Sequence, residues 1–167
     1  MNTFLAKFAN SKSVLLLSIL FVSFNVFVFP RVLPVDKEPL DLQPYFSAER
    51  AYQLIATFDD NLRQRYLVTE MTVDVIYPVV YTLLFSFIIM MLYGSVQLAK
   101  VPFLILIADL IENTGIVLML KNYPEKLETL ATITGVFTSL KWCMVLISVS
   151  IILFGAGRKL ISSLSKK

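Results

Sequence analysis

The run VPFLILIADLIENTGIVLML, residues 101–120, is apolar over a length that can cross about 30 Å of hydrocarbon, yet it carries polar side chains at its centre. These are Asp109, Glu112 and Asn113. At about 100° per residue they fan over about 100° of one helix face. A bilayer core tolerates such groups only when they are buried and paired. The run therefore predicts a spanning helix with this polar face turned into a bundle.

The composition of the 167-residue chain is that of a membrane protein. Hydrophobic residues make up 57% of it and charged residues 16%, and the mean hydropathy is +0.74, which is too apolar for an ordinary soluble domain. The chain has no histidine and a single cysteine, Cys143. Zinc sites and His-ligated haem sites therefore lack their donors, so we expect no metal and no cofactor. We expect Cys143 to be a small core residue, because no imidazole is present to activate it.

Four segments are long and apolar enough to cross a bilayer: 13–30, 73–93, 101–120 and 130–156. They predict an all-α fold, a bundle of four transmembrane helices in one integral membrane domain over residues 1–167. Asn25 is the strongly polar residue of the first span. It is expected either to make an interhelical hydrogen bond or to reach the polar centre of the bundle.

The charges between the spans are divided unequally between the two sides. On one side every charged residue is a cation: Lys7, Lys12, Lys100 and, in the basic tail 157–167, Arg158, Lys159, Lys166 and Lys167. On the other side the cations are mixed with acids. The positive-inside rule then places both termini in the cytoplasm, in a multi-pass protein of the cell (inner) membrane. The tail is expected to contact lipid head groups and not nucleic acid.

The segment between the first two spans, residues 31–60, is expected to lie outside the cytoplasm. Its first part is rich in proline and is expected to be an extended linker. Ser47 can then cap a short amphipathic helix. Its apolar face is formed by Ala51, Leu54, Ile55 and Phe58. This helix could rest in the lipid head groups or cover the bundle as a lid.

The next helix is expected to cover residues 61–94, including the second span, and it carries a polar stripe. On a 3.6-residue period the members of this stripe lie within about 80° of one another: Arg63, Tyr66, Glu70, Asp74, Tyr77 and Tyr81. Farther along, the same face becomes Phe85 and Ile88. The pattern predicts an outer funnel, Arg63, Tyr66, Glu70 and Asp74, which leads to mid-bilayer and is closed by Phe85 and Ile88. The alternative is a solvated face followed by an aromatic belt, which does not require Tyr81.

Lys141 lies near the middle of the last span, within about 5 Å of the depth of Asp109 and Glu112. We predict that it forms an ion pair with one of these two acids. One negative charge is then left over, so either one acid holds a proton or a cationic ligand or a water-filled cavity compensates it. The candidate ligand-binding cluster is Tyr77, Tyr81, Asp109, Glu112, Asn113 and Lys141. No residue is assigned a catalytic role.

Three kinds of function fit this pattern. The first is binding of a lipid-like or cationic small molecule in an outward-opening cavity within the membrane. In the second, the chain is an accessory or assembly subunit that docks on another membrane protein or on its own copies, and the ion pair is purely structural. The third is an intramembrane acid/base isomerase or lipid-modifying enzyme, in which Glu112 or Asp109 moves a proton. The sequence contains no nucleophile elbow, P-loop or HExxH motif, which favours the first two.

The four-helix plan with buried acids resembles the sterol-isomerase and sigma-2 receptor group. This resemblance covers architecture and not a residue motif, so no residue role is carried over from that group. It implies that a cationic or sterol-like ligand is held between the helices. The paired cysteines that mark tetraspanins, claudins and quinone-linked thiol oxidases are absent from the sequence, which counts against those four-span families.

Overall fold

The computed structural model describes residues 2–32 and 39–165. Within these residues every regular element is a helix, and four helices are long and apolar enough to cross a membrane. The expectation of an all-helical protein with four candidate spans is therefore confirmed. Residues 33–38 of the expected linker, and Lys166 and Lys167 of the expected basic tail, lie outside the described residues.

The first of these candidate spans, which we number as spanning helices in chain order, runs from Ser11 to Val32 in three consecutive pieces. These are α2 (Ser11–Ser23), a π-helical turn (Phe24–Val28) and α3 (Phe29–Val32). Asn10 begins the helix, because its side chain accepts hydrogen bonds from the main-chain N–H groups of Lys12 and Ser13. A short helix, α1 (Asn2–Phe8), precedes it and buries Leu5 against α5 and α6.

The second spanning helix, α5 (Asp60–Tyr93), begins well before its apolar part. Asp59 accepts a hydrogen bond from the N–H of Leu62 at 2.7 Å and caps its start. The helix continues through Pro78 and ends at Gly94, whose φ of 64° is a left-handed conformation that glycine adopts without strain. The short helix α6 (Val96–Ala99) then leads into the third spanning helix, α7 (Phe103–Asn122).

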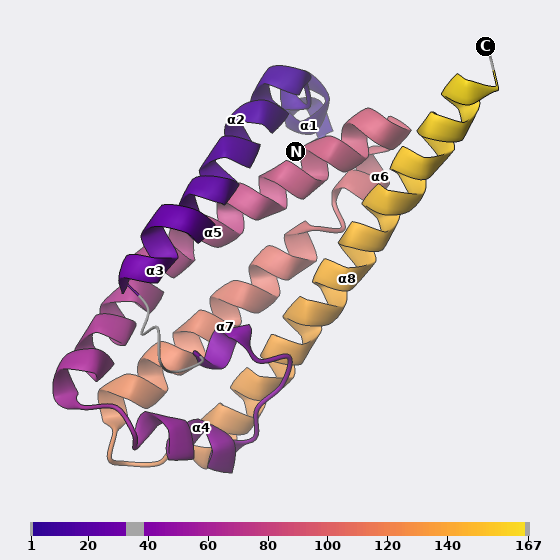
Figure 1. Cartoon of the computed structure of the whole chain (residues 1–167). Coiled ribbons are helices and arrows are strands. Elements are labelled where there is room, and N and C mark those ends of the chain that lie inside the picture. Colours follow the sequence, from indigo (N-terminus) through magenta and orange to yellow (C-terminus); the bar gives the residue numbers. More distant parts are fainter. Residues whose placement is uncertain (1, 33–38, 166–167) are drawn as a thin grey trace.

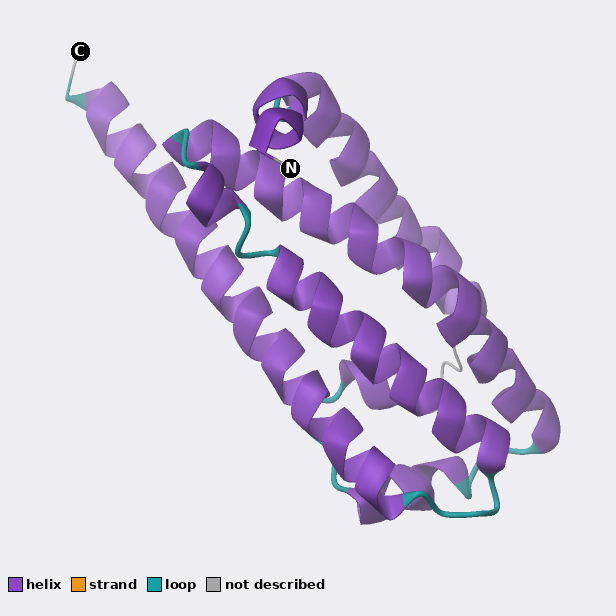
Figure 2. Ribbon diagram, turned by 180° about the vertical axis from the view of Figure 1, so that it is seen from behind, coloured by secondary structure: helices purple, strands orange, loops and turns teal. Residues whose placement is uncertain are grey.

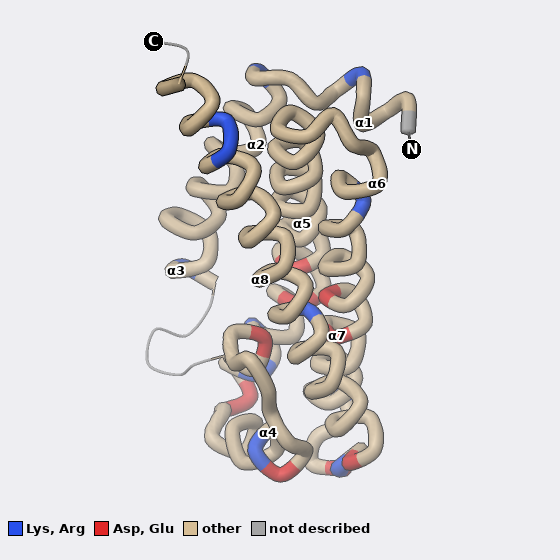
Figure 3. Tube along the Cα trace, turned by 90° about the vertical axis from the view of Figure 1, so that its right-hand side faces the viewer, with Lys and Arg blue, Asp and Glu red and all other residues tan. Residues whose placement is uncertain are grey.

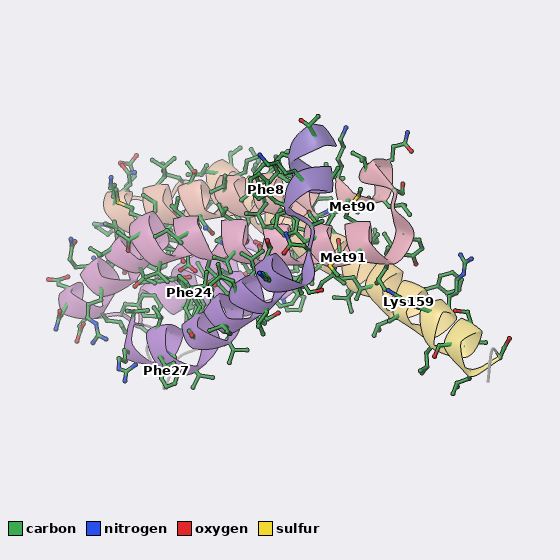
Figure 4. All side chains as sticks on the ribbon, turned by 90° about the horizontal axis from the view of Figure 1, so that it is seen from above. Phe8, Phe24, Phe27, Met90, Met91 and Lys159 are labelled. Carbon is green, nitrogen blue, oxygen red and sulfur yellow. The ribbon has the colours of Figure 1, made fainter. Side chains whose placement is uncertain are left out.

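The fourth spanning helix, α8 (Glu128–Leu164), packs with α5 and α7, and the first helix packs along α5 (Figures 1 and 2). Both termini lie at one end of the bundle, which we call the terminal end. The last turns of α8 project beyond the other helices there, as the position of Lys159 shows (Figure 4). The outward faces of the helices are apolar. Cys143 is exposed on α8, so the expectation that it is a core residue is wrong.

The opposite end is covered by α4 (Ala48–Ile55), and we call it the α4 end (Figure 1). Ser47 caps α4, as expected, by accepting from the N–H of Arg50 at 3.2 Å. The apolar face of α4 is buried in one cluster with residues of α7 and α8. Gly135 lets the chain before α4 approach α8 closely, because a Cβ there would lie 2.1 Å from the main-chain oxygen of Phe46. The helix therefore packs on the bundle as a cover.

The two ends of the bundle differ in charge, as Figure 3 shows. In the described residues at the terminal end, the charged side chains are all cations, whereas the α4 end mixes both signs. A third group of charges, mostly acids, lies inside the bundle between the two ends.

Candidate functional site

The helix packing brings Lys141 of α8 against the acids of α7. Its Nζ lies 2.5 Å from Oε2 of Glu112 and 4.0 Å from Oδ1 of Asp109. Lys141 is 7% exposed and Glu112 is fully buried. The structure thus contains the ion pair expected of Lys141, and Glu112 is the closer partner.

Hydrogen bonds from three helices hold this cluster in place. Thr138 of α8 donates to Oε1 of Glu112 at 2.8 Å, and Tyr81 of α5 donates to Oδ2 of Asp109. Asn113 of α7 donates to the main-chain oxygen of Asp74 at 2.6 Å. Because each bond joins two different helices, the cluster fixes the relative positions of α5, α7 and α8.

Asp41 is a member of the cluster that the sequence does not reveal. It lies in a 3-10 turn, Leu40–Leu42, of the segment expected to be an extended linker. Its main-chain oxygen accepts from Nζ of Lys141 at 3.0 Å, and its carboxylate accepts from the hydroxyl of Tyr66 at 2.8 Å. A proline-rich segment has no helical or strand periodicity, so no pattern in the sequence places Asp41 here.

The residues grouped as an outer funnel occupy the part of α5 nearest the α4 end. Tyr66, Glu70 and Asp74 are all buried there, beneath the turn at Leu40–Leu42 and the packing around α4. Arg63 is partly exposed; it pairs with Asp60 at 3.0 Å and its guanidinium lies 4.6 Å from the ring centre of Tyr123. These four side chains therefore do not line one open channel.

Several buried polar atoms of this region have no hydrogen-bond partner among the described residues. They include both carboxylate oxygens of Glu70, Oδ2 of Asp74 and Oδ1 of Asn113, which are all acceptors, and the indole N–H of Trp142, which is a donor. Native structures leave few buried polar atoms unpaired, so such atoms call for an explanation. In the described part of the chain, no three acids are arranged to hold a metal ion.

A cavity of about 340 Å³ lies beside the cluster, between the first helix, α5, α7 and α8. Of the expected ligand-binding cluster, five residues line it: Tyr77, Tyr81, Asp109, Asn113 and Lys141. Glu112 is not a lining residue. Phe85 lines the cavity, whereas Ile88 is not among the lining residues. The other lining residues are Phe21, Asn25, Phe29, Asp41, Leu42, Asp74, Trp142 and Val145.

The first helix lines one side of this cavity and makes aromatic contacts with Tyr77. The Tyr77 ring lies 5.6 Å from that of Phe21 and 4.9 Å from that of Phe29, measured between ring centres. Asn25, in the π-helical turn, donates to the Tyr77 hydroxyl at 2.9 Å. Asn25 therefore makes an interhelical hydrogen bond and also lines the cavity. π-Helical turns inside α-helices are frequent at functional sites.

Together these features define a small helical protein with four candidate membrane-spanning helices and a buried cluster of one lysine and several carboxylates. Compared with known proteins, the chain matches no family model, no curated protein and no solved structure. The resemblance to the sterol-isomerase and sigma-2 receptor group thus rests on the helical plan and the buried acids alone.

Proposed function

We propose that this chain is an integral membrane protein, with both termini in the cytoplasm, that binds a cationic or lipid-like small molecule in the cavity beside Asp109. The main support for this proposal is the lining of the cavity, which combines acidic side chains with aromatic side chains. Ligand sites are typically apolar hollows with a few convergent polar groups, and a volume of about 340 Å³ lies near the lower end of their usual range.

The balance of charge favours a cationic ligand. Asp41, Asp74 and Asp109 line the cavity, and Lys141 is the lining cation. Lys141 is already engaged by Glu112, behind the cavity wall. The unpaired oxygens of Asp74 and Asn113 can accept hydrogen bonds from a ligand. An ammonium group would donate to such acceptors and lie against the faces of Tyr81 or Trp142.

The position of the first helix favours a ligand that arrives from the lipid. This helix packs mainly along α5, and it is not extensively packed against α8. Phe21 and Phe29 on one side, and Trp142 and Val145 on the other, line the cavity between these two helices. A molecule with an apolar tail could therefore place its head group in the cavity and leave its tail in the bilayer.

The second candidate is an accessory subunit whose ion pair is purely structural. It is favoured by the surroundings of Lys141, which pairs with Glu112 and donates to Asp41 without any ligand. An ion pair of this kind can fix one packing arrangement of the helices.

The test is mass spectrometry of small molecules that co-purify with the protein in a mild detergent. We expect a specific molecule with the wild type, and its loss with Tyr81→Phe and with Asp74→Asn. Tyr93→Phe is the matched control, because the Tyr93 hydroxyl donates to the main-chain oxygen of Ile151, away from the cavity. This control should retain the molecule.

Three other outcomes would contradict this proposal or favour another function. If the molecule remains bound to Tyr81→Phe and Asp74→Asn, the cavity is not its site. If only another membrane protein co-purifies, the accessory-subunit function is correct. Chemical conversion of the molecule by the wild type, but not by the Asp109→Asn variant, would instead indicate an enzyme.

A further inference from the structure

A second hollow lies at the terminal end of the bundle, where α8 runs past the end of α5. It is a groove of about 710 Å³. Met91 and Leu92 of α5 and Ile161 of α8 form apolar parts of its lining, and Arg158 and Lys159 are its cations. The groove is separate from the acidic cavity and shares no lining residue with it.

The groove is formed by the way α5 ends against α8. The Tyr93 hydroxyl donates to the main-chain oxygen of Ile151 at 2.8 Å. The Tyr93 ring lies against Gly155, where a Cβ would be 2.6 Å from the ring carbon Cε2. Immediately after this contact α5 ends at Gly94, whereas α8 continues to Leu164 (Figures 1 and 4). The last turns of α8 thus extend past the end of α5 and form one wall of the groove.

No acid of the described chain neutralises the cations at this end. The sequence has no Asp or Glu in residues 75–108 or 129–165, which form α6 and most of α5 and α8. The described part of α1 and α2 likewise contributes only Lys7 and Lys12. Within residues 2–32 and 39–165, Arg158 and Lys159 therefore have no acidic partner, and an anionic ligand would neutralise them.

Exposed apolar side chains lie on the same last turns of α8 as these cations, and one of them, Ile161, lines the groove. Leu160 is 62% exposed, Ile161 69% and Leu164 64%. A soluble anion such as phosphate would pair with the cations but would not cover the apolar side chains. An anionic phospholipid would do both, because its phosphate can pair with the cations while its acyl chains contact the apolar side chains. Basic pockets between the ends of transmembrane helices commonly bind such head groups.

We propose that the groove between the end of α5 and the last turns of α8 binds an anionic phospholipid. Arg158 and Lys159 hold the phosphate, and Arg158 can donate two parallel hydrogen bonds to it. The Ser162 hydroxyl, which lines the groove, can donate to the head group once its bond to the main-chain oxygen of Lys159 is exchanged. An acyl chain lies along Leu92 and Ile161. This site does not depend on the function proposed for the acidic cavity.

The experiment is native mass spectrometry of the full-length protein titrated with short-chain phosphatidylglycerol in a neutral detergent. Removing both groove cations, in Arg158→Gln/Lys159→Gln, should weaken binding roughly tenfold or more. The matched control is Lys7→Gln/Lys12→Gln, which removes the same charge at the same end but outside the groove. It should bind as the wild type does. Ser162→Asp, which adds a negative charge to the exposed groove, should also weaken binding.

Three results would overturn the proposal. Equal losses in the groove variant and the control variant would mean that only overall surface charge matters. Equal binding of short-chain phosphatidylcholine would remove the requirement for an anion. If glycerophosphoglycerol, which lacks acyl chains, binds as tightly as the lipid, the groove binds a soluble phosphate ester instead. Thermal melting of each variant checks that the fold is intact.

Discussion

Glu112 of α7 is held between two side chains of α8. Nζ of Lys141 lies 2.5 Å from its Oε2, and the Thr138 hydroxyl donates to its Oε1 at 2.8 Å. Since Lys141 and Thr138 are about one helical turn apart, both contacts form only when α7 and α8 pack in one register. The fully buried Glu112 therefore specifies how these two helices meet.

Breaking this ion pair from either side should be costly. Lys141→Met or Glu112→Gln leaves a buried charge without its partner, and each should destabilise the protein by about 3 to 5 kcal/mol. The double variant should lose less than the sum of the two, because neither member of this pair is then left without the other. Denaturant unfolding in detergent measures this double-mutant cycle.

Asp109→Asn combined with Lys141→Met provides the comparison for this cycle. Asp109 lies farther from Lys141, at 4.0 Å, so its coupling energy should be smaller than that of Glu112. Strictly additive losses for Lys141→Met and Glu112→Gln would show that the pair makes no direct energetic contribution.

Glu70 is a buried acid whose carboxylate makes no hydrogen bond with the described residues. It is 1% exposed. Burying an unpaired polar group costs about 1 to 3 kcal/mol. Glu70→Leu should therefore raise the free energy of unfolding by about that amount, measured by chemical denaturation in detergent.

Glu125→Gln is the control for this measurement, since Glu125 is exposed and its substitution should change stability by about 0.5 kcal/mol or less. A clear loss of stability in Glu70→Leu would contradict the prediction. It would mean that Glu70 is held by a bound cation or by another partner.

The spanning helices could be predicted from the sequence because hydropathy and the helical period report them directly. The expected spans lie inside α2–α3, α5, α7 and α8, except that α7 begins two residues after the expected start at residue 101. Counting 1.5 Å per residue brought Lys141 to the depth of the acids. The helices extend beyond the apolar runs because their ends are set by caps such as Asp59 and Gly94. Hydropathy marks only the part of each helix that is apolar enough to cross hydrocarbon.

Other parts of the site could not be predicted, for identifiable reasons. Asp41 reaches Lys141 through an irregular turn, and only tertiary packing determines where such a turn lies. The exposure of Cys143 was missed because α8 is apolar on most of its faces, so composition does not distinguish an outward-facing position from a core position. The burial of Glu70 depends on the segment around Leu40–Leu42 and α4 that covers this part of α5. The polar stripe on α5 does not indicate that this segment folds over it.

The close approach at Gly135 should be sensitive to a single methyl group. An alanine Cβ would lie 2.1 Å from the main-chain oxygen of Phe46, so the segment before α4 would have to move away from α8. Gly135→Ala should destabilise the protein by about 1 to 3 kcal/mol. Gly157→Ala is the control in the same helix, because its Cβ would meet no atom within 4 Å.

Gly157→Ala should be neutral or stabilise the protein by up to about 1 kcal/mol, since alanine favours the helix. Thermal melting of both variants in the same detergent measures the difference. Equal melting temperatures would show that the segment before α4 moves without cost.

The orientation of the protein in the membrane can be tested with single cysteines in a Cys143→Ala background. Cations without acids at the terminal end should hold that end in the cytoplasm. A membrane-impermeant maleimide added to intact cells should therefore label Asn61→Cys, at the α4 end, and should not label Lys100→Cys or Ser163→Cys. The latter two should react only after the membrane is permeabilised, which also serves as the control for their reactivity. The reverse pattern would place α4 in the cytoplasm and refute the proposed orientation, and it would leave the helical fold and the acidic cavity unchanged.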